Sequence, residues 1–427
     1  MTEVLDGDWR PVNAPISRGR QRSSGVSLIL IATVISGAAG YGVLLFVPSV
    51  IGLADYKAFS IFWSLLYLVV GALIGIQQEV TRGTQAVSFR AEPEVSRARN
   101  FGGVTGLAVA MAIVASAPLW MDSAFPGDGW SMVWPLTVGA SSFVMVAVLS
   151  GSLYGIAQWR PLALLMVGDA LLRLIAVLSV LAFTTDTVAL AWAVAIPFPA
   201  TLLIFWWFIR KSVVGKTQLD VGYGRLAWNV SRTVVAAAST GLMVSGFPFL
   251  LGLTSSGESD ELLGLYILCI TVTRAPLIVV AMSLQSYLIV HFRDARERFW
   301  RDFILLQLIV FGGGVVIATL VWAAGPVVFA WLYPGQIGPD GGFLAVLVLS
   351  SALVAALFIS ATAVLSRSQH FVFTLGWVVA ALITIVALVL PLNFDVRVYL
   401  AILVGPTVGL LVHIGCLLAL KPWARNL

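Results

Sequence analysis

The sequence predicts an all-α polytopic membrane protein with twelve transmembrane helices in two parallel six-helix repeats and both termini cytoplasmic. Of its 427 residues, 59% are hydrophobic and only 11% are charged, and the mean hydropathy is +0.98. Apolar segments of the roughly 20 residues that a spanning helix needs cover nearly the whole chain. They leave no room for a sizeable soluble catalytic domain, so we expect a protein that is not an enzyme.

The apolar segments follow one another with short polar connections between them. We expect boundaries to be accurate to about 2–4 residues. The predicted spans are 25–47, 57–84, 101–121, 133–157, 162–183, 188–209, 230–253, 262–290, 303–324, 342–365, 371–391 and 398–420.

The distribution of cations sets the predicted orientation. With the N-terminus inside, 21 of the 25 lysines and arginines fall in cytoplasmic segments, and only Lys57 and Arg397 fall in outer loops. Cytoplasmic loops of membrane proteins carry such an excess of Lys and Arg. The net charge of +5 therefore reflects membrane topology, and we expect no nucleic-acid partner. The expected location is the cell membrane.

Two features of the predicted domain organisation lie outside the spans. Residues 1–24 are polar and are expected to form a disordered cytoplasmic tail, and 210–229 form the longest internal cytoplasmic connection. The remaining segments are an N-terminal bundle (25–209), a C-terminal bundle (230–420) and a short tail (421–427). Cys269 and Cys416 both fall within spans, so no disulfide framework or metal-binding spacing is predicted.

The two predicted bundles show weak internal similarity. Gly37 and Gly42 of the first span superpose on Gly241 and Gly246 of the seventh, and further matches pair the second span with the eighth and the sixth with the twelfth. Parallel repeats of this kind occur in transporters that bind substrate between the halves and rock one against the other. Glycines in spans 1 and 7, with Pro248 in span 7, predict either bends in these two helices or close packing.

Arg173 lies near the middle of the fifth span, where a guanidinium costs roughly 2.5–3.5 kcal/mol by insertion scales. Asp169 precedes it by four residues and shares its helix face. Two interpretations remain open: a self-neutralising pair that stabilises helix packing, or a cation that lines a cavity and is tuned by Asp169. Asp169 is also the deepest acid and a weak candidate for coupling to H⁺ or Na⁺. No other cofactor is expected.

Arg274 lies near mid-depth in the eighth span, and no acid on that span can neutralise it. Thr271 and Gln285 share its face and form a polar stripe with it. Arg274 is therefore a candidate for contact with an anionic substrate, although a bridge to Asp169 would also satisfy its charge.

The inner end of the second span carries a further polar group, GIQQEVTRG (75–83). Gln78 is a candidate substrate contact. Tyr67, the counterpart of Arg274 in the other repeat, is another. Glu79 and Arg82 are weaker candidates for an inner gate or a lipid head-group contact; the alternative is a hydrogen-bonded helix end with an interfacial salt bridge.

These features together resemble the Wzx-type polysaccharide-flippase branch of the multidrug/oligosaccharidyl-lipid/polysaccharide exporter (MATE-like) superfamily. Further residues that carry the resemblance are SGSLYGIAQWRP (150–161) and ISATAVLSRSQH (359–370). The resemblance covers about 25–420 and rests on patterns of small and polar residues. It implies translocation of a polyprenyl-(pyro)phosphate-linked glycan to the outer leaflet, in a cation-lined cavity that Arg173 and Arg274 would furnish.

The implied partners are the lipid-linked glycan, membrane lipids, and glycosyltransferases or a polymerase of the same pathway. Alternatives are a cation-coupled small-molecule or drug exporter and a non-transporting scaffold of a glycan-assembly complex. Spans 1 and 7 lack the acid that drug-exporting relatives carry there, and the loop 84–100 lacks the Asp-Arg-Gly-Arg pattern of major-facilitator transporters.

Overall fold

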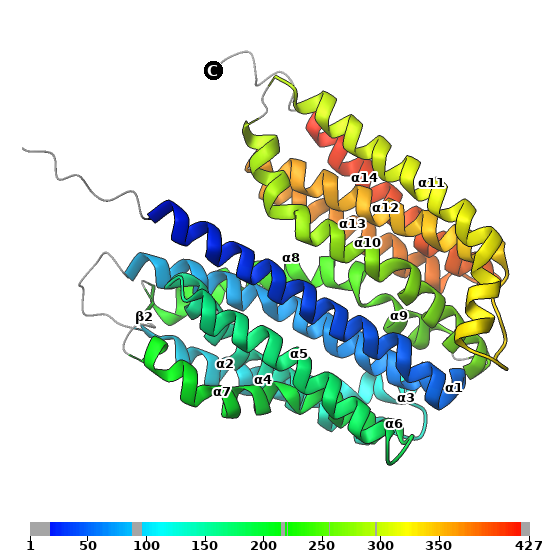
Figure 1. The fold of residues 1–427 in the computed structure, drawn as a ribbon, viewed down its shortest axis with the longest axis horizontal. Coiled ribbons are helices and arrows are strands. Elements are labelled where there is room, and N and C mark those ends of the chain that lie inside the picture. Colours follow the sequence, from blue (N-terminus) through cyan, green and yellow to red (C-terminus); the bar gives the residue numbers. More distant parts are fainter. Residues whose placement is uncertain are drawn as a thin grey trace, which may run out of the picture.

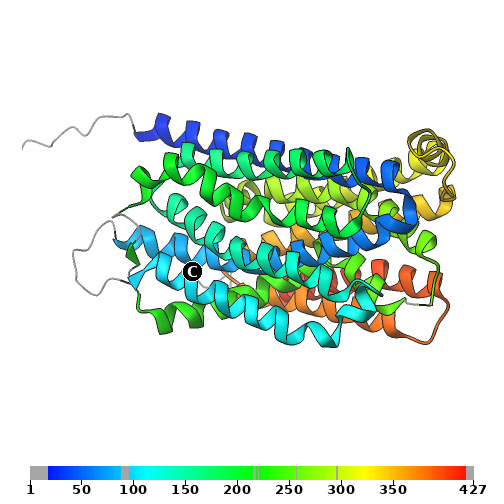
Figure 2. The same cartoon turned by 90° about the horizontal axis from the view of Figure 1, so that it is seen from below.

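The structure is a computed structural model in which long helices run side by side (Figures 1 and 2). It describes residues 18–87, 96–214, 218–219, 221–255, 257–294 and 297–419. Within these residues the only strands are the two-residue β1 (Ser96–Arg97) and β2 (Gln218–Leu219), which pair antiparallel. The predicted all-α class is confirmed.

The helices and their bounds are as follows. They are α1 (Arg18–Val87), α2 (Ala98–Ser116), the 3₁₀ turn η1 (Ala117–Leu119), α3 (Met121–Ala124), α4 (Gly129–Gly155), α5 (Trp159–Leu181), α6 (Thr187–Ala195), α7 (Pro197–Val213), α8 (Tyr223–Val244), α9 (Phe247–Thr254), α10 (Asp260–Asp294), α11 (Phe299–Leu332), α12 (Gly341–Ser366), α13 (His370–Val389) and α14 (Phe394–Ala419).

Helix α1 consists of two arms that meet at Gly52 and hold the first two predicted spans. Gly52 has φ 80° and ψ 170°, a conformation that favours a residue without a Cβ atom, and the chain folds back there (Figure 1). The first arm begins at Arg18, inside the segment that we predicted to be a disordered tail. Residues 1–17 of that tail lie outside the described residues.

Each of the twelve predicted spans overlaps a helix or a pair of helices. Among the described residues, nine helices are long and apolar enough to cross a membrane, and the bent pair of α8 and α9 would make ten. That count treats both arms of α1 as one helix and does not include α10. The chain is therefore a multi-pass membrane protein, and the number twelve stays a prediction.

The glycines of spans 1 and 7 predicted either a bend or close packing, and a bend is present in span 7 but not in span 1. Span 7 is broken into α8 and α9, which meet at 73°, and Pro248 lies in the first turn of α9. The first arm of α1 is helical through Gly37 and Gly42. Glycine merely weakens a helix, whereas proline also removes a backbone donor and clashes with the preceding turn.

The helices gather in two bundles that spread apart toward the end holding the start of α1 and the end of α14 (Figure 1). We call α1–α7 the first bundle, α8–α14 the second, and the contact of α1 with α8, α9 and α10 the seam. Near Gly52 the two bundles are also joined outside the seam, by hydrogen bonds from Tyr333 Oη to the Leu45 carbonyl and from Gln336 Nε2 to the Pro48 carbonyl, each 3.0 Å.

Candidate functional site

A cavity of about 1020 Å³ lies inside the first bundle and reaches the seam. Both arms of α1, α4 and α5 line it, and α10 adds Tyr287. Asp169 and Arg173 lie in its wall at mid-helix on α5, together with Tyr67 from the second arm of α1. Three of the residues predicted from the sequence are therefore brought together.

The Arg173 guanidinium is buried and its hydrogen-bonding capacity is largely used. Its Nη1 and Nη2 atoms lie 2.9 and 3.0 Å from the two carboxylate oxygens of Asp169. Its Nε donates to the carbonyl of Val194 at 3.1 Å. Its Cζ lies 4.4 Å from the centre of the Phe198 ring and 5.7 Å from that of Tyr67. This is a bidentate pair with aromatic rings beside it, a geometry that Arg forms well.

A break in a neighbouring helix supplies the carbonyl for Arg173. Helix α6 ends at Ala195, and Pro197 begins α7. The last four carbonyls of a helix lack intrahelical partners, and that of Val194 is one of them. The sequence showed Pro197 but gave no sign that the adjacent carbonyl would face α5.

Arg274 is buried in a different place, on α10 beside the break between α8 and α9. It is 4% exposed. Its Nη1 donates to the Met243 carbonyl at 3.3 Å, and its Cζ lies 5.2 Å from the centre of the Phe247 ring. Within the described part of the chain, Nε and Nη2 of Arg274 have no hydrogen-bond partner. Its charge therefore lacks the carboxylate that Arg173 has.

The remaining predicted contacts do not line this cavity. Arg274 and Gln285 of α10 are absent from its wall. Thr271 lies beside the buried Tyr56. Gln78 is exposed, whereas its neighbour Gln77 lines the cavity. Spacing along one helix shows which residues share a face, but it does not show toward which neighbouring helix or cavity that face points. The polar stripe on α10 therefore did not identify the cavity wall.

The sequence did not identify the aromatic residues that line this cavity. Tyr154 and Trp159 pack edge to face at 6.2 Å between ring centres, and both line the cavity with Tyr287. Trp159 matched the interfacial aromatic belt, so its sequence position alone did not distinguish a cavity wall from a lipid interface.

Glu79 and Arg82 form a separate polar contact at the opposite end of the seam from Gly52. Arg82 Nη2 lies 2.5 Å from Glu79 Oε2, and the hydroxyl of Thr233 on α8 donates to Glu79 Oε1 at 3.0 Å. The salt bridge expected at this helix end is present, and Glu79 also joins α1 to α8.

The described residues contain no group of three or more His, Cys, Asp or Glu side chains that could hold a metal ion. The absence of a cofactor stays a prediction.

Comparison with known proteins finds relatives that align with nearly the whole chain. The chain is 31% identical over 428 residues to the uncharacterized protein Rv1510 of Mycobacterium tuberculosis, covering 98% of this chain and 95% of the relative. It is 28% identical over 420 residues to the uncharacterized protein Rv3630 of the same organism, covering 98% and 97%. No protein-family model matches the chain.

Solved structures with this fold are transporters of the MATE family and MOP superfamily. An inward-facing multidrug resistance MATE transporter has a TM-score of 0.65 at 13% identity, covering 94% of this chain and 99% of its own. The outward-facing conformation of such a transporter has a TM-score of 0.62 at 14% identity, covering 94% and 97%. A MOP transporter from Pyrococcus furiosus, described as having a binding pocket of reverse polarity, has a TM-score of 0.59 at 16% identity, covering 93% and 96%. At these identities the similarity shows the fold.

Proposed function

The chain belongs to the same protein family as Rv1510 of Mycobacterium tuberculosis, and we propose that it is a membrane transporter that works by alternating access. Its substrate in this proposal is a polyprenyl-(pyro)phosphate-linked glycan, which it moves from the inner to the outer leaflet for cell-envelope polysaccharide synthesis. Both termini are cytoplasmic in this proposal, and glycosyltransferases or a polymerase of the pathway are its candidate partners.

The balance of buried charge carries the proposal. Asp169 neutralises Arg173, whereas Arg274 has two nitrogens without partners in the described residues. The three groups together leave one positive charge deep among the helices. Such a charge in hydrocarbon is expensive unless it meets a partner, and a phosphate offers oxygens that a guanidinium can bind bidentately. We therefore assign the second contact of Arg274 to an anionic head group.

The size and lining of the cavity support a glycan. Its volume of about 1020 Å³ lies at the upper end of the range of about 300–1,000 Å³ for small-molecule sites. The rings of Tyr154, Trp159 and Tyr287 in its wall offer apolar faces for sugar rings beside polar tips. Access to Arg274 in this proposal requires movement at the α8–α9 break.

The opening of the cavity supports a lipid-linked substrate. Leu30 of α1 and Tyr287 of α10 belong to its wall and are 47% and 65% exposed. The cavity therefore opens between these two helices, where a polyprenyl chain can stay in the hydrocarbon while the head group enters. The two bundles are joined near Gly52 and spread apart toward the end that holds the start of α1 (Figure 1), which supports an inward-facing state.

One observation favours a second candidate, a cation-coupled drug exporter. The Asp169 side chain is 17% exposed against 6% for Arg173, so the acid of the pair is the more accessible to the cavity. A cationic drug or a coupling H⁺ or Na⁺ would meet that carboxylate.

The two candidates separate in proteoliposomes. The probes are a fluorescent polyprenyl-pyrophosphate-linked N-acetylglucosamine, whose translocation is read from dithionite quenching, and the cationic dye ethidium. We expect Arg274→Gln to lose most glycan-lipid translocation and Arg274→Lys to retain part of it, because lysine keeps the charge but not the planar fork.

The matched control is Arg397→Gln. Arg397 donates to the carbonyls of Thr254 and Leu388 and lies in the first turn of α14, at the predicted outer side. We expect its replacement to leave translocation unchanged. Unimpaired glycan-lipid translocation by Arg274→Gln, with ethidium transport that requires Asp169, would favour the drug exporter.

A further inference from the structure

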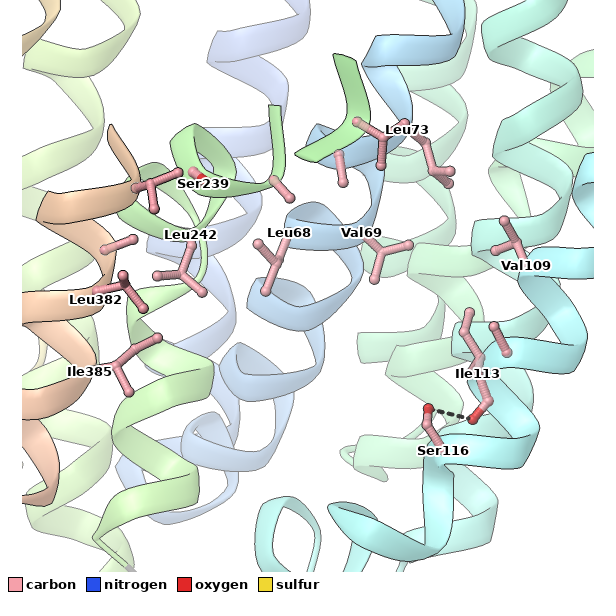
Figure 3. A pocket seen from close by; sticks show the side chains of 16 residues that line it. Leu68, Val69, Leu73, Val109, Ile113, Ser116, Ser239, Leu242, Leu382 and Ile385 are labelled. Carbon is pink, nitrogen blue, oxygen red and sulfur yellow. Dashed lines mark hydrogen bonds between the residues drawn. The ribbon is translucent and has the colours of Figure 1, made fainter. Parts of the chain in front are cut away.

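A second hollow, of about 550 Å³, crosses the seam between the bundles (Figure 3). Its walls come from the second arm of α1 and from α2 in the first bundle, and from α8 and α13 in the second. We call it the seam groove. In Figure 3, Leu68 and Val69 lie between Ile113 of α2 and Leu382 of α13. The groove therefore borders both bodies that alternating access would move.

The lining of the seam groove is apolar and its few polar groups are already satisfied. Among the lining residues only Ser116 and Ser239 have polar side chains. Their hydroxyls donate to the carbonyls of Ile113 and Val235 on their own helices, at 3.2 and 3.1 Å. An apolar cavity without free hydrogen-bonding groups does not hold ordered water. Any molecule that binds in this groove must therefore be apolar.

The groove is closed toward the interior. Gly75 of α1 lies so near α8 that a Cβ atom there would come within 2.9 Å of the Val234 nitrogen, and a Cβ on Gly71 would come within 3.6 Å of the Gly241 Cα. Backbone therefore packs on backbone along the floor of the groove. Toward the outside, Leu382 is 56% exposed, so the groove is open to the bilayer.

The second arm of α1 separates the seam groove from the large cavity. Leu68, Ala72 and Leu73 line the groove, whereas Tyr67 and Ile74 line the cavity, and the two hollows share no lining residue. A molecule in the large cavity is therefore separated from the groove by the second arm of α1. The groove is reached from the bilayer side instead.

We propose that the seam groove binds an acyl chain of a bilayer phospholipid. At about 30 Å³ per methylene, close to the volume share of a water molecule, a chain of about sixteen carbons needs about 480 Å³. A volume of about 550 Å³ accommodates it. Helix α2 packs on α4, and α13 packs on α14 and α8. The acyl chain fills the space between them and links the two bundles on this side.

The test is photocrosslinking in vesicles of phosphatidylglycerol that contain a small fraction of the same lipid with a diazirine on one acyl chain. Peptide mapping should place crosslinks on 68–73, 109–116 and 378–385 several-fold above those on the exposed α11 residues 315–317 and 319–320. Ala112→Phe and Ala238→Phe fill the groove and should reduce its labelling to the level of α11. Ala115→Phe is the matched control, because Ala115 is exposed on α2 and does not line the groove.

Labelling of α11 in each variant shows that the protein is inserted in the bilayer, and an unchanged SDS unfolding curve shows that it is folded. Ala112 is exposed, so its variant tests the proposal even where Ala238→Phe fails to fold. Equal labelling of groove and α11 in the wild type, or groove labelling that the phenylalanines leave unchanged, would overturn the proposal. A diazirine-bearing polyprenyl phosphate that displaces the phospholipid label would assign the groove to the substrate tail instead, and would also overturn it.

Discussion

The ion pair of Asp169 and Arg173 makes an asymmetric prediction for single and double substitutions. Asp169→Leu removes both carboxylate oxygens, which lie 2.9 and 3.0 Å from the guanidinium. It leaves a buried Arg173 with only the Val194 carbonyl. Arg173→Leu leaves Asp169, whose side chain is 17% exposed and can be hydrated in the cavity. The first change should therefore cost more than the second.

The magnitudes follow from charge and burial. Two unit charges about 4 Å apart attract by about 4 kcal/mol at an effective dielectric constant of about 20. Removing one partner of a buried pair costs about 3–5 kcal/mol, which we expect for Asp169→Leu. For Arg173→Leu we expect less than about 2 kcal/mol. The double variant should be within about 1–2 kcal/mol of the wild type, because well-packed apolar residues often replace a buried pair without loss.

The assay is the free energy of unfolding from SDS titration of the purified protein in mixed micelles, measured for all four proteins of the double-mutant cycle. The coupling energy is meaningful because the two residues contact each other. A double variant no more stable than Asp169→Leu, or a cost of Asp169→Leu below about 1 kcal/mol, would refute a neutralising pair. Arg173 would then draw its stabilisation from the cavity contents.

Three further contacts can be tested by substitution. Gly264→Ala would place a Cβ atom 2.0 Å from the Leu53 carbonyl oxygen and should cost at least about 1–3 kcal/mol of unfolding free energy. The control is Gly42→Ala, where a Cβ atom would meet nothing within 4 Å, and it should be neutral or stabilising. Equal effects of the two substitutions would contradict the seam contact between Gly264 and Leu53. Gly376→Ala would place a Cβ atom 2.1 Å from His413 Nε2 and should lower the midpoint of thermal unfolding. Adding His413→Ala should restore part of the lost midpoint. If the double variant is no more stable than Gly376→Ala, this clash is not the cause of the loss. Lys57→Met breaks the bridge to Asp260, which is 61% exposed, so a loss above about 1 kcal/mol in the same SDS titration would contradict a weak surface pair.

The positions of the helices were largely predictable from the sequence because the bilayer imposes a simple rule. A spanning segment must satisfy its backbone hydrogen bonds internally, so each long apolar segment becomes a helix. The breaks were less predictable. Pro248 marked the bend of span 7, but the glycines at 37 and 42 suggested a second bend that the first arm of α1 lacks.

The site was predictable only where its residues belong to one helix. The four-residue spacing of Asp169 and Arg173 gave their ion pair directly. Tyr67 was selected as the repeat counterpart of Arg274, yet its ring lies beside Arg173. Matching repeats aligns positions along the membrane normal but does not set the rotation of each helix, which depends on packing between helices.

The two intramembrane arginines use one structural device with different results. Each donates to a carbonyl next to a helix break, that of Val194 or Met243, and lies over a phenylalanine four residues further on. Since this surrounding is shared, the carboxylate of Asp169 is the main difference in charge between them. An acid on its own helix makes Arg173 a neutral part of the cavity wall. Arg274 lies beside the break between α8 and α9 and has no such acid on its own helix, so under the proposed function its charge is the one that an anionic head group would neutralise.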